Sequence, residues 1–155
     1  MATDKIPAKA SSRTTRRPQQ RVAIDLNEVR GEQNDSAALM VALGRTNMVI
    51  EFQPDGTVIT ANENFLNGVG YSLDEVRGKH HRMFCDSQYV QSTEYREFWA
   101  KLQRGEFVTD DFKRIAKGGR EVWIRAAYNP IVDANGKVLK VVKFATDITD
   151  RKSVV

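Results

Sequence analysis

The turn at Pro54-Asp55-Gly56 constrains the fold of this chain more than any other short stretch. Proline fixes one backbone angle of a tight turn, and glycine accepts the positive φ that such turns require. The segments on either side, Met48–Phe52 and Thr57–Ala61, are rich in the β-branched residues typical of strands. The sequence therefore predicts a β-hairpin over residues 48–61.

Three further strands are predicted in the last third of the chain, at residues 107–115, 121–132 and 138–146. The Lys117–Arg120 segment contains two glycines and joins the first pair, while an Asn135-Gly136 turn joins the second pair. The three strands therefore form an antiparallel meander. The order along the chain is two strands, several helices and three strands.

The middle strand of the meander has two distinct faces, because successive side chains of a strand point in opposite directions. One face carries Val122, Ile124, Ala126 and Tyr128, and the other carries Trp123, Arg125, Ala127 and Asn129. A tryptophan on the second face favours a sheet that is covered on both sides. We expect the central helices on one side, and on the other a helix over residues 36–43 from this chain or a neighbouring copy. Arg125 and Lys143 are expected to be solvated or paired at the covered face.

Capping residues mark the starts of four helices, at Asp35 or Ser36, Asn62, Ser72 with Glu75, and Ser92 or Thr93. The first helix leads to Gly44 and is too short to be stable alone, so it needs a surface to lie on. The last helix has its apolar residues at helical spacing on one face, namely Tyr95, Phe98, Trp99 and Leu102.

Residues 1–34 are polar and lack hydrophobic periodicity, so they are predicted to form a disordered basic tail. A cap helix over 35–47 and one domain over 48–150 are predicted to follow.

The formal net charge of +4 belongs to the tail: residues 1–30 contain seven basic and three acidic residues, and the remainder contains 17 of each. A basic groove for nucleic acid is therefore not expected. No apolar run approaches the ~18 residues of a membrane span, and no signal peptide is recognisable. With a single cysteine, a cytoplasmic location is expected.

The unusual side chains gather between Gly78 and Trp99, where both histidines and the only cysteine are found. His80 and His81 are adjacent and must point in different directions, and a zinc site would need more ligands than Cys85 supplies. In the structural interpretation, Trp99 belongs to the core, His81 bonds its own loop and Cys85 is an inert buried thiol. No nucleophile elbow, phosphate loop or metalloprotease motif is present, so the sequence does not predict an enzyme.

Several motifs in their order and spacing resemble a PAS domain: Ile59–Phe65, Gly70–Lys79, the Trp99 helix, Lys117–Trp123 and Asp147–Thr149. The resemblance implies an α+β fold, a five-stranded antiparallel sheet with short helices on one face and an N-terminal cap helix. More specifically, the chain is similar to PAS domains of cytoplasmic or aerotaxis-type chemoreceptors. The residues that carry this likeness are His81–Phe84, Tyr95–Trp99, Trp123–Ala126 and Tyr128–Ile131.

Such a relationship implies a sensory module that detects oxygen, redox state or a small molecule in an internal pocket and relays the signal through the last strand. It implies haem b or FAD as candidate cofactors, or none, with His81, Trp99, Asn62 and His80 as the residues nearest to them. A haem iron would use His81 or His80. Light-sensing relatives place a cysteine in Asn-Cys-Arg-Phe, which this sequence lacks. The implied partners are a second copy of the chain and a downstream signalling module or histidine-kinase pathway. The alternative is a cofactor-free dimerisation module.

Overall fold

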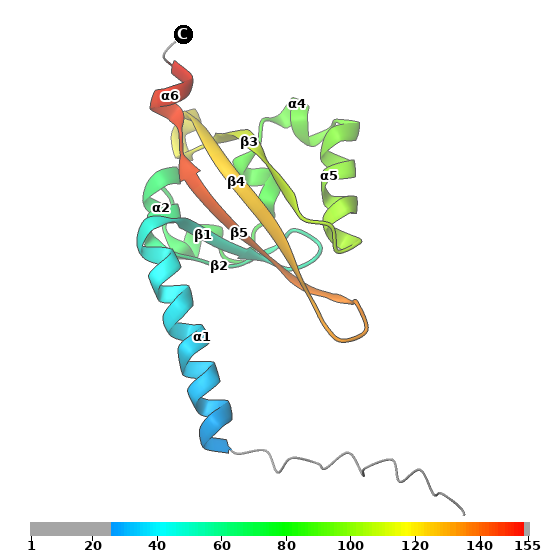
Figure 1. Ribbon diagram of the computed structural model, residues 1–155. Coiled ribbons are helices and arrows are strands. Elements are labelled where there is room, and N and C mark those ends of the chain that lie inside the picture. Colours follow the sequence, from blue (N-terminus) through cyan, green and yellow to red (C-terminus); the bar gives the residue numbers. More distant parts are fainter. Residues whose placement is uncertain (1–25, 154–155) are drawn as a thin grey trace, which may run out of the picture. The chain divides into compact units, whose positions relative to one another are not determined.

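The computed structural model describes residues 26–153, and its centre is one antiparallel sheet of five strands (Figure 1). The strands lie in the order β2-β1-β5-β4-β3. Their bounds are Met48–Phe52 (β1), Val58–Ala61 (β2), Val108–Ile115 (β3), Glu121–Val132 (β4) and Val138–Asp147 (β5). The predicted α+β class and the five-stranded sheet are confirmed, with each strand end within one residue of its expected position.

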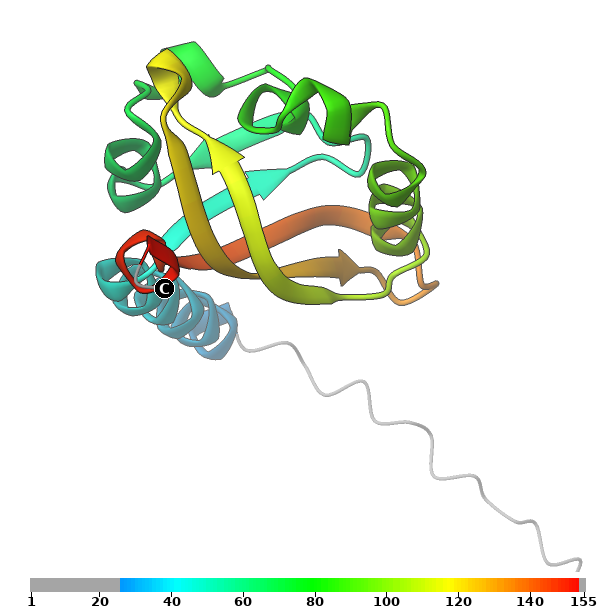
Figure 2. The same cartoon turned by 90° about the horizontal axis from the view of Figure 1, so that it is seen from above.

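Five short helices between β2 and β3 cover one face of the sheet, called the inner face below (Figure 2). They are α2 (Glu63–Val69), α3 (Leu73–Val76), the 3-10 helix η1 (His81–Phe84), α4 (Ser87–Val90) and α5 (Thr93–Gln103). Three of the four predicted caps are confirmed, since the side chains of Asn62, Ser72 and Ser92 each accept a hydrogen bond from a backbone N–H three residues on. The cap predicted at Asp35 or Ser36 is wrong, because both residues lie inside α1 (Leu26–Thr46). Glu75 completes the predicted capping box.

The core lies between the inner face and these helices. Its strand side includes the four predicted inward residues of β4, Val122, Ile124, Ala126 and Tyr128, all buried. Its helical side includes the predicted stripe of α5, Tyr95, Phe98, Trp99 and Leu102, also buried. Aromatic rings dominate the centre of this core, so most of its stability comes from large apolar surfaces removed from water.

The Pro54-Asp55-Gly56 turn joins β1 to β2 as predicted and is held against the residue before η1. Gly56 has a φ of 93°. A Cβ atom at this position would lie 2.6 Å from His80 Nε2, so the close approach of the histidine requires glycine. The turn therefore helps to fix where η1 begins.

The outer face of the sheet is less covered than the sequence predicted. Trp123 lies there as expected, and its ring is contacted by Lys152 of α6 (Thr149–Ser153), whose Nζ is 5.1 Å from the ring centroid. Arg125 is paired as expected, with Nε donating to Asp111 Oδ1 at 2.9 Å. Coverage of this face by a neighbouring copy stays a prediction.

Helix α1 spans Leu26–Thr46 and begins well before Asp35, where the sequence predicted its start. The additional residues include good helix formers and no proline, so they extend the helix although they lack apolar periodicity. The rest of the predicted tail, residues 1–25, lies outside the described residues. From Leu39 onward the chain forms one compact unit that includes the sheet. No helix within residues 26–153 has the length and apolarity to cross a membrane.

Candidate functional site

The side chain of His81 lies in the interior of the fold, at the first position of η1. His80 caps this helix, with Nδ1 accepting a hydrogen bond from Arg82 N at 3.1 Å. The backbone N–H of His81 donates to Gly56 O at 2.8 Å and so ties the helix to the β1–β2 turn. Held in this way, the His81 ring enters the core and is 0% exposed.

Both ring nitrogens of His81 are bonded to tyrosine hydroxyls. Nδ1 lies 2.9 Å from Tyr95 Oη on α5, and Nε2 lies 3.0 Å from Tyr128 Oη on β4. A neutral imidazole has one donor and one acceptor, so one tyrosine donates to the ring and the other accepts from it. Cys85 Sγ is 3.6 Å from Nδ1. The His81 ring therefore links the helical layer to the centre of the sheet.

Two cationic side chains lie beside this network, Arg114 on β3 at 2% exposed and Lys143 on β5 at 1% exposed. Arg114 Nη2 donates to Tyr128 Oη at 3.0 Å, and its guanidinium lies 4.6 Å from the Phe112 ring centroid. Lys143 Nζ lies 5.0 Å from the ring centroid of Tyr128 and 5.4 Å from that of Phe65. The expectation that Lys143 is solvated or paired at the sheet's covered face is wrong, since its ammonium lies against two core rings.

We call this group of buried side chains the polar cluster, comprising His81, Cys85, Tyr95, Arg114, Tyr128 and Lys143. Burial lowers the pKa of His81 well below its usual range, and the nearby Arg114 and Lys143 lower it further. Burial likewise lowers the pKa of Lys143, raises that of the Cys85 thiol and raises that of Tyr128 to about 12. At neutral pH, His81 is therefore uncharged and Cys85 is a thiol, the inert form that the sequence predicted.

Trp99 packs against the polar cluster from α5. Its ring centroid is 5.4 Å from that of His81, and the side chain is buried in the core as predicted. Burial raises the pKa of the neighbouring Tyr95 well above its usual range. Among the described residues, Nε1 has no partner with hydrogen-bond geometry. The predicted pair His81 and Trp99 is thus brought together.

His80 faces a different environment from His81, as the adjacency of the two residues predicted. Its Nε2 donates to the backbone oxygen of Asp55 at 2.8 Å, and its Nδ1 accepts the capping bond from Arg82. The ring contacts Trp99, at 6.0 Å between centroids. Both nitrogens of His80 therefore hold the turn and η1 in place.

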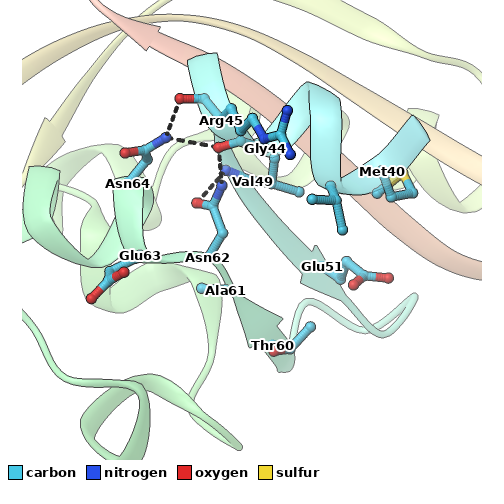
Figure 3. A pocket seen from close by; sticks show the side chains of 11 residues that line it. Met40, Gly44, Arg45, Val49, Glu51, Thr60, Ala61, Asn62, Glu63 and Asn64 are labelled. Atoms are coloured by element: carbon cyan, nitrogen blue, oxygen red, sulfur yellow. Dashed lines mark hydrogen bonds between the residues drawn. The ribbon is translucent and has the colours of Figure 1, made fainter. Parts of the chain in front are cut away.

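Asn62 lies apart from the polar cluster, where α1, β1 and α2 meet (Figure 3). Its Oδ1 accepts hydrogen bonds from Phe65 N and Val49 N, both at 2.9 Å. Its Nδ2 donates to Gly44 O at 3.1 Å and to Asn47 O at 2.9 Å. All four bonds of the amide are used. Asn62 joins three elements and has no donor or acceptor left for a ligand.

The arrangement around His81 does not suit a haem iron. A proximal histidine needs a bare ring nitrogen, and both nitrogens of His81 carry hydrogen bonds, as do both of His80. An FAD ring would have to displace core rings such as Phe98 and Tyr128, whose centroids are 4.8 Å apart. Within residues 26–153, no group of three or more His, Cys, Asp or Glu side chains is placed to hold a metal ion.

The end of β5 is joined to β4 by a short set of bonds. The backbone N–H of Ile148 donates to Trp123 O at 2.8 Å, and Trp123 N donates to Thr149 Oγ1 at 3.0 Å. Asp147 Oδ1 accepts from Thr149 N at 2.8 Å. The start of α6 is therefore fixed to the strand that carries Tyr128.

Known proteins similar to this chain occur among signalling proteins. The biofilm dispersion protein BdlA of Pseudomonas aeruginosa is 42% identical over 129 residues, which are 83% of this chain and 31% of that protein. A blue-light-activated histidine kinase of Brucella anthropi is 30% identical over 96 residues, 62% of this chain and 19% of the kinase. The chain thus spans less than a third of either relative.

A solved PAS domain from Colwellia psychrerythraea superimposes with a TM-score of 0.66 at 19% identity, covering 76% of this chain and 99% of that domain. An RNA-binding light-oxygen-voltage receptor gives a TM-score of 0.63 at 21% identity, over 76% of this chain and 34% of the receptor. At such identities the likeness concerns the fold alone. The family model for the PAS fold matches residues 58–145, more than half of the 155 residues. The chain therefore belongs to the PAS family, a family of sensory modules in signalling proteins.

Proposed function

We propose that this PAS domain is the sensory module of a chemoreceptor-like signalling protein and that it senses a small molecule, oxygen or redox state through the polar cluster. The observation that carries the proposal is the cluster itself. A domain that needed only stability would gain more from apolar side chains than from buried Arg114, Lys143 and His81. Because the histidines are already hydrogen-bonded, we favour a small molecule over a haem-bound gas.

The proposed relay runs along β4 and β5. Tyr128 and Lys143 are direct cross-strand partners in this pair, and both reach into the polar cluster. A ligand that shifts the balance between two packings of these side chains would move the strands and thereby the start of α6, which is bonded to Trp123. The output would be a signalling module beyond the domain or a histidine-kinase pathway in the cytoplasm. The role is recognition and relay, not catalysis.

The test combines an absorption spectrum with ligand screening of the full chain purified from its native host. We expect no Soret band and no flavin bands. At least one compound from a library of acidic, neutral and basic metabolites should raise the midpoint of thermal unfolding, since a ligand at 100 times its Kd stabilises by about 2.7 kcal/mol. Hydrogen exchange should slow in β5 and α6 when that compound is bound. A chain that binds no compound and carries no chromophore would contradict the proposal.

A second candidate function is a cofactor-free dimerisation module, and the observation that favours it is a group of exposed apolar side chains on α1. In the part of α1 that belongs to the compact unit, the large apolar side chains are exposed: Leu39, Met40, Val41 and Leu43. Monomeric proteins rarely expose contiguous apolar patches without a partner. Dimer formation is compatible with sensing, so this candidate concerns what the domain does when no ligand is present.

We propose that a second copy of α1 occupies the surface hollow beside these side chains (Figure 3). The hollow is lined by the apolar Met40 and Val41 of α1 and Val49 of β1, and also by charged residues such as Arg45 and Glu51. A two-fold axis beside α1 would bring the apolar side chains of each copy to the hollow of the other, which gives the self-complementary contact of a symmetric dimer. Such a copy would also shield the outer face of the sheet.

Replacing Val41 with glutamate should weaken the dimer at least tenfold, since a carboxylate would enter an apolar contact. Sedimentation over a range of protein concentrations measures this change. Leu139→Glu is the matched control, because Leu139 is similarly exposed, 53% against 60% for Val41, but lies at the β4–β5 hairpin. Wild-type protein that is monomeric at high concentration, or equal weakening by both variants, would contradict a dimer through α1.

A further inference from the structure

Three side chains in and beside the polar cluster have a donor nitrogen without a hydrogen-bond partner among the described residues, and two of these nitrogens are themselves buried. Lys143 Nζ makes no hydrogen bond or ion pair with the described residues and lies only against rings. Arg114 Nε and Trp99 Nε1 are buried and have no hydrogen-bond partner in this part of the chain. All three groups are donors of hydrogen bonds at their usual protonation. What the cluster lacks is an acceptor.

The polar cluster also lacks a negative charge to balance its basic side chains. Arg114 and Lys143 are both buried, and neither forms an ion pair with a carboxylate anywhere in residues 26–153. The other polar members, His81, Cys85 and the two tyrosines, are uncharged at neutral pH. A buried charge without a counter-ion is costly, and proteins usually pair it; for Lys143 this cost is expressed as a lowered pKa. A bound water could accept a hydrogen bond but would supply no negative charge.

We propose that the polar cluster binds the carboxylate group of a ligand, with Lys143 and Arg114 as its charged contacts and Trp99 as a further donor. This inference rests on the proposed function, in which the interior of the domain is the sensing site. It adds the chemical class of the ligand. A guanidinium with a free N–H and an ammonium beside it match the two oxygens and the single negative charge of a carboxylate.

The surroundings favour a small monovalent anion. Tyr128 lies between the two cations, bonded to Arg114 through its hydroxyl and stacked under Lys143 through its ring. A carboxylate can accept from both sides of this arrangement after a modest movement of the tyrosine, whereas a larger dianion must shed more water to enter a core of packed rings. Binding would also favour the protonated form of Lys143 and would move β5, which carries that residue.

The same carboxylate chemistry has two sources, a free organic acid or the propionate of a porphyrin. The first arm of the test measures acetate, pyruvate and benzoate by calorimetry on the full chain, each against its neutral amide. We expect at least one acid to bind and its amide to bind at least tenfold more weakly. The second arm titrates haem and its dimethyl ester and follows the Soret region; binding of haem but not of its ester would assign the carboxylate to a propionate.

Three variants link binding to the named residues. Lys143→Met and Arg114→Met should each weaken binding of the responsive acid at least tenfold. Lys140→Met is the matched control, since Lys140 lies on the same strand but pairs with Glu51 at 2.5 Å, and it should bind as the wild type does. Circular dichroism is the check that each variant is folded, and the methionine side chain retains the apolar length of lysine.

The outcomes separate this inference from the proposed function. If an amide or the haem ester binds as well as the acid, or if Lys143→Met binds the acid with unchanged affinity, the carboxylate site is wrong and the sensory function survives. If neither arm nor the metabolite library yields a ligand of any charge, both are contradicted. Tighter binding of an acid than of its amide, lost in Lys143→Met and kept in Lys140→Met, supports both.

Discussion

Replacing Tyr128 with phenylalanine is expected to lower the free energy of unfolding by about 3 kcal/mol, because two buried groups lose their partner at once. The hydroxyl bonds His81 Nε2 at 3.0 Å and Arg114 Nη2 at 3.0 Å. Removing it leaves a neutral ring nitrogen and one N–H of a cation unsatisfied in the core, and an unsatisfied charged donor is the more costly of the two. The ring itself stays, so packing changes little.

Urea unfolding followed by circular dichroism measures this loss, and a constant slope with denaturant would show that the denatured state is unchanged. Tyr71→Phe is the matched control, since the Tyr71 hydroxyl makes no hydrogen bond with the described residues and its ring also contacts the core. The control should stay within about 0.5 kcal/mol of the wild type. An equal loss of unfolding free energy in the two variants would mean that the hydrogen bonds of the Tyr128 hydroxyl do not stabilise the fold.

Local sequence signals were enough to predict the framework of this fold. The Pro54-Asp55-Gly56 turn, the Asn135-Gly136 turn and the caps at Asn62 and Ser72 act within four residues of where they stand, so their outcome does not depend on distant parts of the chain. The periodicity of α5 likewise reports directly which side is buried. These features are physically local, and the structure confirms them.

The start of α1 could not be predicted in the same way. The sequence argument required apolar periodicity, and the residues from Leu26 to Asp35 show none. A helix needs only compatible residues and no breaker, and periodicity appears only where one side must be buried. Missing periodicity therefore means only that no side of a helix has to be buried. The sequence argument wrongly took it to mean that no helix forms.

The position of Lys143 was predictable from the sequence, although the argument stopped short of it. Pairing residues backwards from a two-residue turn at Asn135-Gly136 places Lys143 opposite Tyr128. The structure has this pair although its turn is one residue longer, with Asp133 N donating to Lys137 O, because a register shift between Ile131 and Val132 compensates for the extra residue. Tyr128 was already assigned to the inner face. Cross-strand partners share a face, so the lysine had to point into the core as well. What misled the argument was the general rule that lysine avoids the interior.

The hydrogen bonds of the His81 side chain could not be predicted from the sequence, because they join residues that are distant along the chain. Its partners Tyr95 and Tyr128 come from α5 and β4, and only the packing of the helical layer on the sheet brings their hydroxyls together. The sequence could single out His81 and Trp99 as unusual residues. It could not tell that Asn62, named with them, would have its amide fully used at the junction of α1 and α2.

The same polar cluster weakens the fold that contains it. Tyr128 stabilises its neighbours through hydrogen bonds, whereas the buried amine of Lys143 contacts the aromatic rings of Phe65 and Tyr128. Residues that cost stability and make no structural bond are most easily understood as binding groups, since a ligand can supply the missing partner. The two residues should therefore respond to substitution in opposite directions.

Lys143→Met is expected to raise the free energy of unfolding by about 2 kcal/mol, within the range found when buried ionic groups are replaced by apolar ones. The pKa of Lys143 is lowered by burial, so the unfolded chain binds more protons than the folded one up to the usual lysine value of about 10.4. Stability of the wild type should accordingly rise with pH relative to the variant, and the advantage of Lys143→Met should shrink towards pH ~10.

Urea unfolding of wild type and variant at several pH values between neutrality and about 10 measures both parts of this expectation. Lys140→Met, on the same strand but paired with Glu51 on the surface, should change stability by less than about 1 kcal/mol and show no such pH trend. A destabilised Lys143→Met protein would mean that the ammonium gains more from the rings of Phe65 and Tyr128 than it loses by leaving water. In that case Lys143 would be a structural residue, and the argument for a ligand that completes its bonding would lose its main support.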